Sequence, residues 1–146
     1  MLSNSCRYGI RAVIYLASQQ PAGIKVGIKQ ISKDLDLPTP FLAKILQQLA
    51  KQKILSSSKG PHGGFSLQKD PHNITLLDIV NTIDGSDTFT GCVMHKGTCE
   101  GVAGEKKLCP LHDDYDKTRS ELLKLFSSKT IYDLVEKSFS SDYIAI

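Results

Sequence analysis

The chain has 146 residues, 40% of them hydrophobic and 23% charged, which supports one ordinary hydrophobic core and does not require a second. The sequence contains no run of about 18 apolar residues and no secretory signal pattern, so we expect a cytoplasmic protein that does not meet a membrane. The net charge of +3 is divided unevenly: residues 1–69 carry +8 and residues 70–146 carry −5. The basic half indicates either contact with a polyanion or a solvated basic surface.

Three helices are predicted in the basic half. Apolar residues at three-to-four spacing indicate a helix over residues 3–19, and Pro21 and Gly23 stop this pattern. A short second helix is predicted over residues 28–35 and a third over residues 38–51. The third helix has an apolar stripe that we expect to face the core, formed by Leu42, Ile45, Leu46 and Leu49.

A β-hairpin and a fourth helix follow. Residues 54–58 and 65–68 alternate in polarity and flank a basic, glycine-rich loop, which is typical of a hairpin. Thr75 and Asp78 form a capping-box pattern at the start of the fourth helix, and Gly85 ends it.

The last part of the chain carries the cysteines. Residues 85–110 show no periodicity and contain three of the four Cys, so we expect a loop with a function. A helix is predicted over residues 113–126, and a capping pattern at Thr130 begins a short final one. The expected organisation is a DNA-binding domain at 1–84, a Cys-rich sensor loop at 85–112, and a dimerisation helix with a C-terminal helix at 113–146.

Two helices joined by a tight turn and followed by a basic hairpin form the order of a winged helix-turn-helix, a mainly α fold with a small β wing. The second helix of the pair is predicted to enter the major groove, where Gln47 matches adenine and Lys44 matches guanine or a phosphate. The wing loop has a structural alternative, a hairpin whose glycines serve only its tight turns. The candidate DNA-binding residues are Arg7, Thr39, Pro40, Ala43, Lys44, Gln47, Lys59, Gly60 and His62.

Three stretches carry a resemblance to a known family: RYGIRA at residues 7–12, residues 42–49, and above all KGPHGGFSL at residues 59–67. They resemble the Rrf2 family of bacterial winged-helix transcriptional regulators, and the similarity runs from Tyr8 to about Val135. The resemblance implies a homodimer held by the 113–126 helix, and two-fold symmetry then predicts a palindromic DNA operator. We expect the regulator to be a repressor. An enzyme is not expected, because the sequence has no nucleophile elbow, paired carboxylate motif or Walker loop.

The cysteine loop has the pattern C-x6-C-x9-C-x2-H, formed by Cys92, Cys99, Cys109 and His112. Thiolates suit iron–sulfur clusters, and an imidazole can replace a thiolate at iron. The C-x2-H ending resembles the three-Cys, one-His [2Fe–2S] site found in the family, which implies that these four residues hold such a cluster.

Alternatives remain for the fourth ligand and for the cofactor. Some family members use an acidic ligand from the first helix, but the matching residue is Arg7, which cannot bind iron, so His95 and Cys6 are the other choices. A zinc site is a competing interpretation, although a close C-x2-4-C pair is missing. A regulator without a cofactor, sensing through a redox-active Cys pair or a protein partner, is the other, and three Cys with unrelated roles is the simplest alternative.

Overall fold

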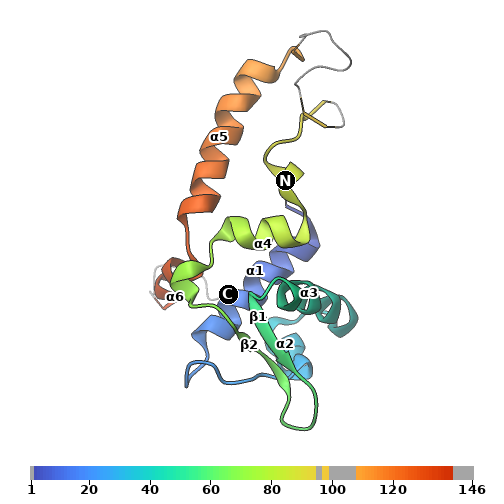
Figure 1. Cartoon of the computed structure of the whole chain (residues 1–146), viewed down its shortest axis with the longest axis vertical. Helices are drawn as coiled ribbons and strands as arrows, with labels where there is room; N and C mark the ends of the chain where they lie inside the picture. Colours follow the sequence, from blue (N-terminus) through green and yellow to red (C-terminus); the bar gives the residue numbers. More distant parts are fainter. Residues whose placement is uncertain (1, 95–96, 99–107, 140–146) are drawn as a thin grey trace.

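A computed structural model describes residues 2–94, 97–98 and 108–139 of the chain. The structure is mostly helical with a two-stranded antiparallel hairpin, so the predicted winged-helix fold class is confirmed. Figure 1 shows a helical body from which the hairpin extends at one end and the long helix α5 rises toward the other. His95 and Cys99 lie outside the described residues.

Helices α1 (Asn4–Ser18), α2 (Ile28–Leu35) and α3 (Thr39–Lys51) match the three predicted helices to within one or two residues at each end. Helix α1 begins at an N-cap serine, Ser3, whose hydroxyl accepts a hydrogen bond from the Cys6 amide at 3.0 Å. The sharp turn after α2 is made by a residue in the left-handed region, Asp36, with φ 51°.

The wing consists of β1 (Leu55–Ser58) and β2 (Gly64–Leu67), paired from Leu55 opposite Leu67 to Ser58 opposite Gly64. A third segment joins the wing, because Val26 and Phe65 exchange two backbone hydrogen bonds of 2.9 Å each. Since Val26 lies two residues before α2, this bridge ties the wing to the start of α2.

Two helices begin with the capping boxes that the sequence predicts. In α4 (Leu76–Ile83) the box is formed by Thr75 and Asp78, and in α6 (Ile131–Ser138) by Thr130 and Asp133. A short 3-10 turn, η1 (Pro71–Asn73), leads into α4. The starts of the two helices are joined by backbone hydrogen bonds from Leu76 to Lys129 at 2.9 Å and from Ile131 to Ile74 at 2.8 Å, so the C-terminal helix docks on the winged domain.

The main hydrophobic core lies among α1, α2, α3, the base of the wing and α6. The predicted stripe of α3 is confirmed, since all four of its residues are buried there. The fully buried residues of this core include Val13, Ile31, Leu42, Leu46, Leu49, Leu55, Ile74, Ile79 and Ile131. At about 0.8 kcal/mol for each buried CH₂ group, this burial is the main source of stability for the domain.

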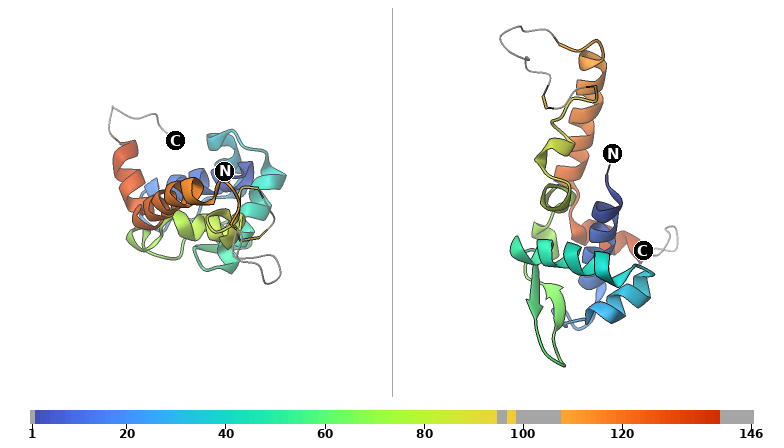
Figure 2. Two further views of the ribbon diagram at one scale, coloured as in Figure 1. Left: turned by 90° about the horizontal axis from the view of Figure 1, so that it is seen from above. Right: turned by 90° about the vertical axis from the view of Figure 1, so that its right-hand side faces the viewer.

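A second, smaller cluster joins the N-terminus of α1 to the long helix. It is built on Cys6, Val80 and Phe89, and side chains of α5 (His112–Ser128) pack against it. Phe89 follows a 3-10 turn, η2 (Ser86–Thr88), and its ring lies 4.9 Å from that of Phe126. Helix α5 therefore rests on the body at its C-terminal end, while its other end extends away, as both side views show (Figure 1 and Figure 2).

None of the residues of α5 is buried, although the whole helix belongs to the described part of the chain. Leu111, directly before the helix, is 40% exposed, and Leu125 within it is 47% exposed.

Within the described residues, no helix combines the length and the apolar character that crossing a bilayer requires.

Candidate DNA-binding surface and cysteine site

The turn between α2 and α3 is fixed by polar contacts. The Ser32 hydroxyl donates to the Leu37 carbonyl and lies 2.7 Å from the hydroxyl of Thr39. The Arg11 guanidinium donates to the Leu35 carbonyl at 2.9 Å and so fastens the end of α2 to α1. These bonds hold α3 at a set angle to α2, as a helix-turn-helix requires.

The face of α3 opposite the core carries the predicted contact residues. Pro40, Lys44 and Gln47 are exposed, whereas Thr39 and Ala43 are half-buried. Phe41 is 66% exposed on the flank of this face and was not among the residues predicted from the sequence. Its position outside the apolar stripe was the signal that could have found it, because a large aromatic residue off the core face is left in solvent.

The predicted wing residues Lys59, Gly60 and His62 are all exposed at the tip of the hairpin. The tip is closed by a hydrogen bond from the Gly63 amide to the Gly60 carbonyl at 3.0 Å. Between the wing and the start of α2 lies a groove of about 510 Å³, whose lining includes Gly27, Lys29, Ser58, Pro61 and Gly64. Lys29 is a further exposed cation beside the wing that the sequence reasoning missed.

Arg7, the remaining predicted DNA-binding residue, is exposed at the end of the first turn of α1. Its amide donates to the Ser3 carbonyl at 3.1 Å, which is an ordinary bond of the first helical turn. The assignment of Arg7 to DNA stays a prediction.

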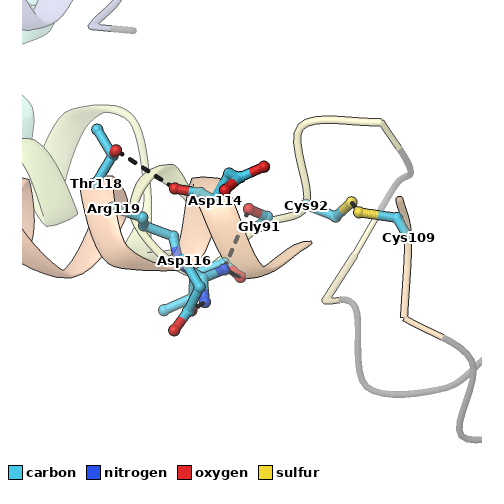
Figure 3. Close-up of polar contacts among 8 residues, drawn as sticks. Gly91, Cys92, Cys109, Asp114, Asp116, Thr118 and Arg119 are labelled. Atoms are coloured by element: carbon cyan, nitrogen blue, oxygen red, sulfur yellow. Dashed lines mark hydrogen bonds and ion pairs between the residues drawn. The ribbon is translucent and has the colours of Figure 1, made fainter. Parts of the chain in front are cut away.

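Two of the four predicted cluster ligands lie next to each other. The Sγ atoms of Cys92 and Cys109 are 3.7 Å apart, although the two residues are 17 positions apart in the sequence (Figure 3). The Met94 amide donates to the Cys92 sulfur at 3.4 Å, and the Cys92 amide donates to the Gly97 carbonyl at 2.7 Å. Both cysteines are half-buried.

His112, the predicted fourth ligand, is the first residue of α5 rather than the last residue of the loop. Its amide donates to the Cys109 carbonyl at 2.9 Å, so Cys109 and His112 belong to one turn of the chain that opens the helix. In residues 2–94, 97–98 and 108–139, no three His, Cys, Asp or Glu side chains are grouped closely enough to hold a metal ion.

Cys6, the alternative ligand in α1, lies in the second hydrophobic cluster with 0% of its surface exposed. Burial, followed by the nearby Asp84 carboxylate, raises the pKa of the Cys6 thiol from 9.0 to about 12. The thiol is therefore protonated at neutral pH, and a thiolate is the form that binds metal. This environment is typical of a cysteine that acts as a small apolar residue.

A cavity of about 620 Å³ lies between the cysteine loop and α5. Its walls combine polar and apolar side chains, and its lining residues are Phe89, Thr90, Thr98, Leu108, His112, Asp116, Arg119, Ser120 and Leu123. The cavity places His112 beside the charged pair formed by Asp116 and Arg119.

A helix-turn-helix with a fastened turn, an exposed face on its second helix and a basic wing defines the class of winged-helix DNA-binding proteins. The profile of the Rrf2 family, described as an iron-dependent transcriptional regulator, matches residues 2–137. The chain belongs to the Rrf2 family and is a transcriptional regulator, as the resemblance in the sequence predicts.

Among its relatives, an HTH-type transcriptional regulator of Aquifex aeolicus (strain VF5) is 33% identical over 135 residues, covering 92% of this chain and 91% of that protein. The transcriptional regulator IscR of Escherichia coli O1:K1 / APEC is 29% identical over 134 residues, with coverage of 92% and 79%. The fold is shared with two solved structures. CymR, the global cysteine regulator of B. subtilis, has a TM-score of 0.74, 22% identity and coverage of 94% and 97%. T. potens IscR has a TM-score of 0.75, 20% identity and coverage of 100% and 93%.

Proposed function

We propose that this regulator is a homodimeric repressor that binds a palindromic operator through α3 and the wing, and that a [2Fe–2S] cluster changes its affinity for DNA. The cluster ligands in this proposal are Cys92, Cys99, Cys109 and His112. The observation that carries the sensor part is the 3.7 Å separation of the Cys92 and Cys109 sulfurs, directly before the helix proposed to hold the dimer together. The description of the family as iron-dependent supports the same assignment.

Two thiols and one imidazole among the described residues are donor types that suit a cluster, and the two thiols already lie together, whereas no three such side chains are grouped there. Two sulfurs 3.7 Å apart suit neighbouring positions on one cluster, and His112 starts from the same turn as Cys109. Cys99, the third thiol, lies outside the described residues. A bound [2Fe–2S] cluster supplies reversible one-electron chemistry.

The chain's own residues provide the link from the cysteine site to DNA. Because His112 is the first residue of α5, a change at the site acts on the N-terminal turn of that helix. Helix α5 packs on the second hydrophobic cluster, which contains residues of α1 and α4, and α1 in turn packs on α3. A two-state change in α5 is thus connected through packed side chains to the helix that enters the major groove.

The DNA-binding part is tested by removing single cations. We expect Lys44→Ala and Lys59→Ala each to weaken binding almost equally on all DNA sequences, because a phosphate contact carries no base information. Each change should lower the slope of log affinity against log salt concentration by about one. Fluorescence anisotropy titrations on operator and random duplexes at several salt concentrations measure both quantities.

Lys117→Ala is the matched control, since Lys117 is an exposed cation on α5. Figure 1 shows that α5 and the wing extend toward opposite ends of the molecule. It should leave the salt slope unchanged. If Lys59→Ala behaves like this control, the assignment of the wing to DNA is wrong.

The dimer is tested on α5, whose apolar residues are not buried within one chain. We expect Leu125→Glu to convert a dimer into a monomer at micromolar concentration, because a carboxylate loses its hydration in an apolar interface. Light scattering after size-exclusion chromatography gives the mass. Ser127→Glu, which adds the same charge at an exposed site on the helix, should remain dimeric. A wild-type monomer, both alone and with DNA, would contradict the proposal.

The short sulfur–sulfur distance also supports a second candidate, a regulator without a cofactor that senses oxidants. In that reaction hydrogen peroxide takes two electrons from Cys92 and Cys109, an S–S bond forms, both thiol protons leave, and two water molecules are released. Iron and sulfide analysis with an absorption spectrum of anaerobically prepared protein separates the two candidates. Uptake of zinc without iron and sulfide would contradict the cluster.

A further inference from the structure

Arg119 joins α5 to the segment that leads into the cysteine site. Its Nη1 atom donates to the Thr90 carbonyl at 2.8 Å and to the Gly91 carbonyl at 3.5 Å, and its Nη2 atom pairs with the Asp116 carboxylate (Figure 3). The Arg119 side chain is only 18% exposed. The Arg119 guanidinium thus reaches Thr90 and Gly91, which lie 29 and 28 positions before it in the sequence.

The bonded carbonyls lie immediately before Cys92. Phe89, the residue before these two carbonyls, is buried, and its ring contacts that of Phe126 in α5. Residues 89–91 are therefore attached to α5 at two points seven residues apart on the helix, near Arg119 and near Phe126. Gly91 directly precedes Cys92 in the chain. The hydrogen bonds from Arg119 to residues 90–91 therefore fix the position of the Cys92 backbone, from which its sulfur extends.

The chemistry of this contact requires an arginine. A guanidinium presents donors in a rigid planar fork, so it can bond to two backbone carbonyls and a carboxylate at once. A lysine ammonium keeps the charge but has no fork, and a glutamine amide has no charge. The Asp116 carboxylate balances the charge of the guanidinium in its half-buried position.

A simpler interpretation is that Arg119 and Asp116 form an ordinary ion pair on a helix surface. Such i,i+3 pairs contribute little to stability when they are exposed. That interpretation does not explain the two hydrogen bonds to the loop, which use the other nitrogen of the guanidinium.

We propose that Arg119 is a positioning residue that holds Cys92 against Cys109 by fixing residues 90–91 to α5. This role rests on the proposed function of the cysteines as a joint sensor site. In this role Arg119 fixes the position of the loop that carries Cys92 relative to the start of α5, where Cys109 lies.

The test measures how readily the two sulfurs are bridged, in protein without a cofactor. In a Cys99→Ser background, a dibromobimane-type reagent becomes fluorescent only after it has alkylated both Cys92 and Cys109. Cys6 is buried and its thiol has a raised pKa, so it does not compete for the reagent. The measured quantity is the ratio of bridged to singly alkylated protein under limiting reagent.

We expect Arg119→Gln to lower this ratio about tenfold, because the charged hydrogen bonds that hold residues 90–91 to α5 are lost. Arg119→Lys should restore part of it, because one charged donor still reaches a carbonyl. The control Lys117→Gln removes the same charge from the exposed side of α5 and should match the parent protein.

Helical circular dichroism and the midpoint of thermal unfolding separate a local effect from unfolding. If Arg119→Gln does not fold, the Arg119→Lys variant decides the question, with a ratio below that of the parent expected. A ratio equal to that of the parent in the folded Arg119 variants would overturn the positioning role.

Cluster loading gives an independent readout in the wild-type background. We expect Arg119→Gln to shift the visible circular dichroism of the cluster and to speed its loss in air, while Lys117→Gln does neither. If wild-type protein takes up no cluster, the proposed cofactor is wrong, but the bridging ratio still decides the role of Arg119.

Discussion

Gly64→Ala should detach the wing and lower the affinity for DNA at least about tenfold, because this position has no space for a side chain and an unfavourable backbone conformation for one. A Cβ atom at Gly64 would lie 2.5 Å from the Val26 carbonyl oxygen and 2.6 Å from its carbon. The φ angle of 153° is also one that residues with a side chain rarely adopt. Both obstacles are backbone features, so no side-chain rotation can relieve them.

The expected structural consequence is local. To admit the methyl group, β2 must move away from Val26, which breaks the two hydrogen bonds between Val26 and Phe65. A strained position of this kind costs about 1–3 kcal/mol, so the free energy of unfolding should fall by that amount. Urea unfolding and anisotropy titration with an operator duplex measure the two effects.

Gly27→Ala is the matched control for this prediction. Gly27 has a φ of −67°, and no heavy atom of the described residues lies within 4 Å of the added Cβ. Because Gly27 is the N-cap of α2, this change should lower the free energy of unfolding by only a few tenths of a kcal/mol, up to about 1 kcal/mol. Equal effects of the two substitutions would show that the wing does not depend on the Val26 contact.

Cys109→Ser should remove most of the iron and sulfide from anaerobically reconstituted protein, which in the wild type should reach about two of each per chain. Cys109 contacts both of the other described ligands. Its sulfur lies beside that of Cys92, and its carbonyl accepts a hydrogen bond from the His112 amide. A serine hydroxyl is a poor ligand for iron in place of a soft thiolate. Colorimetric iron and sulfide assays and the visible spectrum give the result.

Cys6, the cysteine in α1, supplies the control. Cys6→Ala removes a buried thiol with a raised pKa from the second hydrophobic cluster, so it should leave the iron content unchanged. His112→Ala tests the fourth ligand in the same assay, and an unaltered cluster in that variant would transfer the role to His95. A Cys109→Ser protein with a full cluster would contradict the proposed site.

The sequence by itself determined the elements whose signals are local. The apolar stripe of α3 follows from three-to-four spacing within one helix, and the start of α4 follows from Thr75 and Asp78, three residues apart. The glycine-rich wing and its place after α3 were readable for the same reason, since a hairpin pairs segments that are near neighbours in the chain. These features, together with the motif at residues 59–67, were sufficient to predict the winged fold and the family.

Only the tertiary structure decided which distant segments meet. The 3.7 Å approach of Cys92 to Cys109, the bond of Arg119 to Thr90 and the bridge of Val26 to Phe65 each join residues 17 to 39 positions apart. No periodicity encodes such pairs, because they depend on how α5 packs on the second hydrophobic cluster and how the wing returns to the start of α2. The burial that sets Cys6 apart from the loop cysteines has the same origin, since the environment of a thiol is set by the helices packed around it rather than by its neighbours in the chain.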